Sequence, residues 1–128
     1  MRMNLPPKKL RARLTKLLLA YYRNENPDGF KVALNDFCAH YRVKRPKVQW
    51  VPASKLGKNA ALTFDNGVLH LITPVEWGRM PSKYDRSPMQ WIFSLYHEFY
   101  HFLHWVNDEN KADEFARKML AGIEGVPK

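Results

Sequence analysis

Residues 87–106 read SPMQWIFSLYHEFYHFLHWV, and this stretch decides the fold. Ser87-Pro88 is a favourable helix start, because serine can cap free N–H groups and proline fits the first turn. From residue 89 to 106, apolar side chains fall on almost every side of such a helix, which predicts a central and buried element. Polar side chains inside it need a chemical reason, because burying an unpaired polar group is costly. These polar residues are Gln90, Ser94, His97, Glu98, His101 and His104.

The pattern HEFYH at positions 97–101 is typical of a metal site on a helix. Residues four apart project from the same face, so His97 and His101 can present ring nitrogens to one ion. Glu98 lies on the flank of this pair and can reach a metal-bound water without being a ligand. We therefore expect zinc at His97 and His101, with Glu98 as the base. The alternative is two buried histidines that are satisfied by neighbouring groups.

A catalytic zinc usually has three protein ligands and an open position for water, so a third ligand is required. Glu109 is the candidate, because it shares a face of the next predicted helix with Ala112 and Ala116. Such small residues let two helices approach closely. Asp108 and Glu114 are the reserve candidates for the same role.

Asp113 follows Glu109 by one helical turn and can accept a hydrogen bond from the far nitrogen of a ligand histidine. The simpler alternative is that Asp113 pairs with Arg117 on a solvated face, as Glu114 can pair with Lys118. An aspartate is a poor helix former in mid-helix, which favours the role beside the metal.

Together, HEFYH at 97–101 and ENKADEFA at 109–116 resemble the gluzincin metallopeptidases. The closer resemblance is to the minigluzincins and to the related peptidase domains of ImmA/IrrE type, and it covers about residues 60 to 121. The resemblance implies a small sheet beside the active-site helix, an edge strand that binds an extended peptide, and hydrolysis by zinc-bound water. No residue stands out as a transition-state helper, so an active and a latent enzyme both fit the sequence.

The rest of the chain predicts an α+β fold. Apolar spacing indicates two N-terminal helices, one opened by Pro6-Pro7 and one starting after Asp28. Strands are expected at 48–51, 61–64 and 68–72, with Asp65-Asn66-Gly67 turning the last two into a hairpin. Residues 74–88 carry three prolines and predict a loop, and a final helix should run from about 109 to 121. The result is a sheet of about three strands beside the buried helix.

The second hairpin strand is the expected substrate site. Val68, Leu69, His70 and Leu71 would form an edge to which an extended polypeptide adds through main-chain hydrogen bonds. His70 itself is expected to be structural. For His104, one turn past His101, we expect a place in the core or on the substrate side and not a fourth ligand.

The length of 128 residues fits one domain, with a helical part at 1–45 and a catalytic part at 46–128. The single Cys38 excludes an internal disulfide and any zinc site rich in thiolates. No stretch of eighteen apolar residues occurs, so no transmembrane helix is expected, and no signal peptide is evident. These features favour the cytoplasm.

The formal net charge of +9 indicates contact with acidic partners, and the excess of Lys and Arg lies before residue 60. The alternative function is therefore a basic nucleic-acid-binding or regulatory protein whose metal site is structural or vestigial. No signature of a nucleic-acid-binding fold accompanies the charge, so a zinc peptidase acting on a peptide or protein substrate ranks first.

Overall fold

The structure, a computed structural model, describes residues 5–51, 61–63, 68–79, 87–104 and 108–123. These residues form an α+β fold with five helices and a small sheet, which confirms the predicted class. The helices are α1 (Lys8–Tyr22), α2 (Gly29–Tyr41), α4 (Pro74–Trp77), α5 (Pro88–His104) and α6 (Glu109–Leu120). The strands are β1 (Lys47–Val51), β2 (Ala61–Thr63) and β3 (Val68–Ile72).

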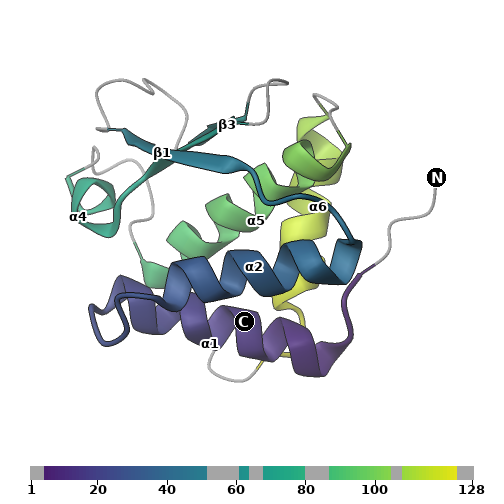
Figure 1. Cartoon of the computed structure of the whole chain (residues 1–128), viewed down its shortest axis with the longest axis horizontal. Helices are drawn as coiled ribbons and strands as arrows, with labels where there is room; N and C mark the ends of the chain where they lie inside the picture. Colours follow the sequence, from purple (N-terminus) through teal and green to yellow (C-terminus); the bar gives the residue numbers. More distant parts are fainter. Residues whose placement is uncertain (1–4, 52–60, 64–67, 80–86, 105–107, 124–128) are drawn as a thin grey trace.

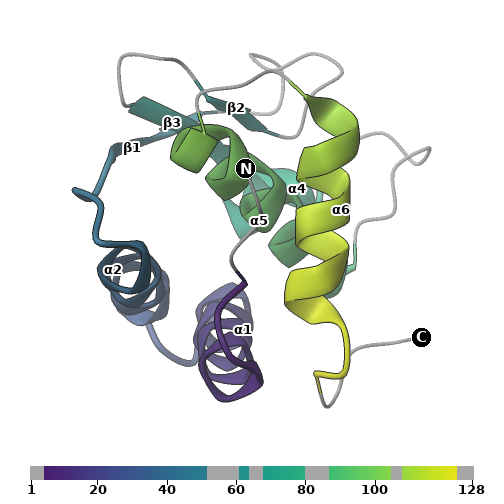
Figure 2. The same cartoon turned by 90° about the vertical axis from the view of Figure 1, so that its right-hand side faces the viewer.

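Helix α5 lies in the middle of the molecule, with the sheet above it, α1 and α2 below it, and α6 along one side (Figures 1 and 2). The side chains of Trp91, Tyr96 and Phe99 are almost completely buried. This burial is predicted by the apolar residues on almost every side of the helix. The Trp91 indole N–H donates to the carbonyl of Ile72 at 2.8 Å. This bond joins the central helix to the end of β3, so a buried polar group is satisfied where two layers meet.

Helices α1 and α2 lie side by side and form the layer below α5 (Figure 1). Their close approach depends on Gly29, because a Cβ built there would lie 2.4 Å from the backbone oxygen of Leu17. Helix α1 also contacts α5 through a buried hydrogen bond of 2.9 Å between the hydroxyls of Thr15 and Tyr96. The N-terminal helices are therefore part of the same core as the histidine helix.

The strand order β1-β3-β2 corrects the predicted substrate edge. Strand β3 pairs in parallel with β1 and antiparallel with β2, so it is the central strand. Residues 69–71 have a paired neighbour on each side, for example His70 between Gln49 and Leu62. The edge predicted at Val68, Leu69, His70 and Leu71 was wrong, because β1 already pairs with that side of β3. The predicted turn at 65–67 lies outside the described residues.

A second correction concerns the predicted loop at 74–88. Residues Pro74–Trp77 form the single-turn helix α4. Thr73 caps it, since its hydroxyl accepts a hydrogen bond from the Glu76 backbone N–H at 3.2 Å. The Trp77 side chain is buried, which holds this turn against the protein.

Helix α6 returns along α5 and packs against it. Its buried face contains Ala112, Phe115 and Ala116. The two alanines are completely buried, as close packing of the two helices requires. No helix in the described part of the chain has both the length and the apolar character that crossing a bilayer would need.

Candidate metal centre

The rings of His97 and His101 face one another on α5. Their Nε2 atoms are 3.1 Å apart, and the ring centroids are 4.8 Å apart. This arrangement follows from the four-residue spacing, which brings two side chains onto one face of a helix. His101 is buried and His97 is largely buried, so the facing nitrogens lie in a sheltered position.

Glu109, the first residue of α6, reaches this pair from the neighbouring helix. Its Oε2 atom lies 2.6 Å from Nε2 of His97 and 3.0 Å from Nε2 of His101. The reach is short because α5 ends at His104 and α6 begins at Glu109. Burial acts to raise the pKa of Glu109, but the hydrogen bond with His101 and the histidine charges outweigh it, and the pKa is lowered.

Three donor atoms therefore converge from two helices, with mutual distances between 2.6 and 3.1 Å. Ligand atoms placed tetrahedrally at 2.0–2.1 Å from zinc would be separated by about 3.3 Å. The triangle formed by His97, His101 and Glu109 is only slightly smaller, so a modest opening admits an ion of this size.

Asp113 holds the outer side of the His97 ring. Its Oδ1 atom lies 2.7 Å from His97 Nδ1, one helical turn along α6 from Glu109. A neutral ring that donates its Nδ1 proton to this carboxylate presents a bare lone pair at Nε2. That lone pair faces the Glu109 oxygen, another acceptor, and their close approach is favourable only with a cation or a proton between them.

Glu98 completes the buried group. Its Oε2 atom lies 3.6 Å from His97 Nε2, and the residue is buried. His97, Glu98 and His101 form a group that could hold a metal ion, with ligand atoms within 4.8 Å of one another. Glu109 is more exposed than Glu98, but its oxygen is closer to His97 Nε2, at 2.6 Å, and it also lies 3.0 Å from His101 Nε2. We therefore favour Glu109 as the third ligand position.

The reserve candidates for the third ligand have other partners. Asp108 caps α6, since its Oδ1 atom accepts a hydrogen bond from the Lys111 backbone N–H at 3.0 Å. Glu114 pairs with Lys118 at 2.8 Å, and this pairing is the main reason that its pKa is lowered. Asp108 directly precedes the predicted final helix, and an aspartate in that position is a capping signal that the sequence already contains.

His104 and His70, which the sequence places outside the expected ligand set, have other surroundings. The His104 ring packs against Tyr100, with ring centroids 4.5 Å apart. Burial, and next the charge of Lys111, lower the pKa of His104. His70 is half-buried in β3, the central strand of the sheet.

Comparisons with protein-family models, with curated proteins and with solved structures find no match to this chain. The interpretation of the site therefore depends on its residues and their geometry.

Proposed function

We propose that this protein is a zinc-dependent peptidase of the gluzincin type. The observation that supports the proposal is the convergence of His97 Nε2, His101 Nε2 and Glu109 Oε2 within 3.1 Å of one another. Two imidazoles and one carboxylate are the ligands of many catalytic zinc sites, which leave a position open for water. Calcium and magnesium prefer sites made of oxygen atoms, so the two nitrogens favour zinc.

Zinc in such a site acts as a Lewis acid and makes water a better nucleophile near neutral pH. The protein's own residues would then supply orientation and proton transfer. Asp113 holds the His97 ring by the Nδ1 contact, which keeps Nε2 directed at the site. His101 from α5 and Glu109 from α6 would hold the ion from two sides, since their side chains meet at 3.0 Å.

Glu98 would move the proton. Its carboxylate is buried beside His97 and lies 3.6 Å from His97 Nε2, whereas the Glu109 oxygen lies 2.6 Å from the same atom. In this position it can accept a proton from the attacking water and pass it to the leaving amine.

The substrate would be an extended polypeptide. Strand β2 packs against α5 and has β3 on one side only within the described residues. Its outer side can offer backbone N–H and C=O groups to another extended chain. We therefore place the substrate along β2 in this proposal, in place of the central strand β3.

The test is peptide cleavage by purified protein with bound zinc, compared with Glu98→Gln at equal zinc content. The amide keeps the size of the side chain but cannot accept the proton, so we expect zinc to remain and cleavage to fall by about 100-fold or more. Glu114→Gln is the matched control and should cleave like the wild type. Cleavage by Glu98→Gln at the wild-type rate would show that another residue is the base.

A second candidate function is a basic nucleic-acid-binding or regulatory protein with a structural or vestigial metal site. The observation that favours it is the formal net charge of +9. Bound zinc without cleavage of any peptide, together with salt-dependent binding to nucleic acid, would support this second candidate.

A further inference from the structure

The connection between α2 and β1 is strongly basic. Residues 42–47, which we call the basic connection, read RVKRPK and contain four cations. Arg42, Lys44, Arg45 and Lys47 are all exposed. The sequence contains no aspartate or glutamate between Asp36 and Asp65, so no acidic neighbour in the chain offsets this charge.

The ion pairs of the described residues involve other cations. Among the ion pairs of the described residues, none joins the basic connection to a carboxylate. Asp36, on the adjoining helix α2, is bound to Arg13 at 2.9 Å. The positive charge of residues 42–47 is therefore available to an external anion.

The backbone of the basic connection is held in place, which distinguishes it from a loose charged run. Arg42 adopts a left-handed conformation with φ of 56° and ends α2, and the Val43 N–H donates to the Cys38 carbonyl at 3.0 Å. Pro46 is buried. The Arg45 side chain donates to Asn35 at 2.7 Å and keeps further N–H donors for a ligand. A segment whose backbone is already fixed loses less conformational entropy on binding than a mobile one.

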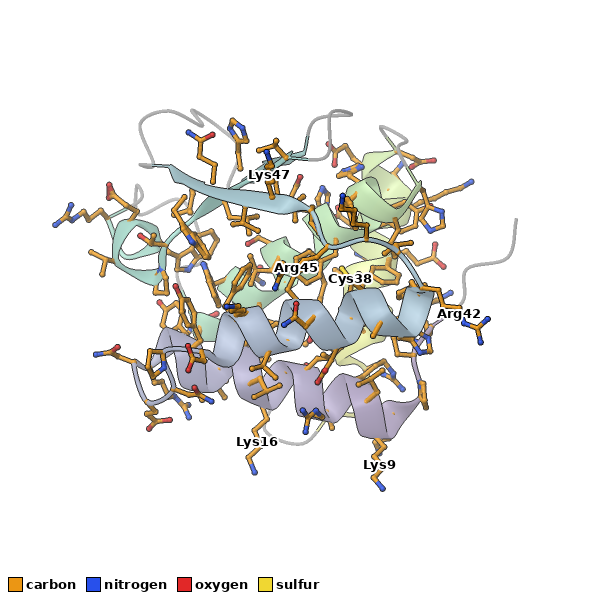
Figure 3. The ribbon with its side chains drawn as sticks, viewed as in Figure 1. Lys9, Lys16, Cys38, Arg42, Arg45 and Lys47 are labelled. Carbon is orange, nitrogen blue, oxygen red and sulfur yellow. The ribbon has the colours of Figure 1, made fainter. Side chains whose placement is uncertain are left out.

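Figure 3 shows Arg42, Arg45 and Lys47 following one another from the end of α2 to the start of β1. In Figure 2 this connection lies on the opposite side of α5 from α6. The metal centre lies between α5 and α6, so the basic connection is on a different face. Lys9 and Lys16 point outward from α1, below this face (Figure 3).

We propose that the basic connection binds the phosphate backbone of a nucleic acid. Arginine and lysine neutralise phosphates, and such contacts need no base-specific residues. A membrane surface is a weaker fit, because membrane-binding surfaces place apolar side chains beside their cations. Within residues 42–47 the large apolar side chain exposed to solvent is Val43, at 36%.

The test is fluorescence anisotropy with labelled duplex DNA and single-stranded RNA, measured at several salt concentrations. Lys44→Gln with Lys47→Gln removes two cations of the basic connection. The control, Arg79→Gln with Lys118→Gln, removes two cations that are paired with Glu76 and Glu114. We expect the first variant to bind about tenfold more weakly, with a salt slope smaller by about two, and the control to bind like the wild type.

Both nucleic acids should bind if the backbone alone is recognised, and binding to one of them would identify the form preferred. A metal chelator should leave binding unchanged. The proposal is overturned by an absence of binding at 50 mM salt, by equal losses in both double variants, or by binding to anionic vesicles alone. None of these results bears on peptide cleavage, so the proposed enzyme stands or falls separately.

Discussion

Asp113 and Glu114 are neighbours on α6 that face different surroundings. The Asp113 carboxylate lies 2.7 Å from His97 Nδ1, whereas Glu114 pairs with Lys118 on the surface. The sequence alone left both a solvated and a metal-side role open for Asp113. The direction in which each side chain leaves α6 thus decides whether its carboxylate contacts the candidate metal centre or forms an exposed ion pair.

We predict that removing the Asp113 carboxylate and removing the Glu114 carboxylate have different effects on zinc binding. Asp113→Ala should weaken zinc binding about 10- to 100-fold, because His97 loses the group that fixes its tautomer and orientation. Glu114→Ala should leave zinc binding unchanged. Competition with a chromogenic chelator measures both affinities. Equal zinc affinities of the two variants would show that Asp113 does not support zinc binding.

Gly29 shows how one position controls the packing of two helices. The backbone oxygen of Leu17 occupies the space where a Cβ would lie, so any larger residue must push α1 and α2 apart. Gly78 is a useful contrast, because a Cβ there would meet its nearest neighbour at 3.5 Å.

We predict that Gly29→Ala lowers the free energy of unfolding by roughly 1–3 kcal/mol, as overpacking does. Gly78→Ala should change it by less than about 0.5 kcal/mol. Urea denaturation followed by circular dichroism measures both values. An unchanged midpoint for Gly29→Ala would mean that the two helices are not packed as closely as described.

The elements show which parts of the fold a sequence can reveal. Helix α5 and the positions 97 and 101 on its face follow from local apolar content and spacing, so they could be predicted. The sheet order could not, because the parallel pairing of β1 with β3 joins residues about twenty positions apart without a local signal. Helix α4 was missed because four residues are too few for a periodic pattern, although Thr73 and Glu76 have the spacing of a capping box.

For the molecule as a whole, Arg11 joins the first helix to the last. Its guanidinium donates to the carbonyls of Lys118 at 2.8 Å and Ala121 at 3.0 Å, where α6 ends. A cation is favourable at a helix C-terminus, where the last carbonyls lack the full set of helical partners. The Lys118 carbonyl also accepts the Ala121 backbone N–H at 3.3 Å. The sequence shows a basic residue at position 11 but not the helix end that it meets, because 107 residues separate Arg11 from Lys118.

We predict that Arg11→Met destabilises the protein by about 1–3 kcal/mol, because charged hydrogen bonds are lost at the end of α6. Lys9→Met, an exposed cation on the same helix, is the control and should have little effect. Thermal unfolding of the zinc-free protein measures the stability of each variant relative to the wild type. Equal melting temperatures for the two variants would argue against the link between α1 and α6.

The central claim is that α5 and α6 together hold one zinc ion through His97, His101 and Glu109. The most direct measurement is zinc stoichiometry and affinity for the wild type, Glu109→Ala and Glu114→Ala, with His97→Ala and His101→Ala as further variants. We predict about one zinc per chain in the wild type and in Glu114→Ala, none in either histidine variant, and much weaker binding in Glu109→Ala. A zinc-free wild type, or zinc lost from Glu114→Ala and retained by Glu109→Ala, would contradict the account.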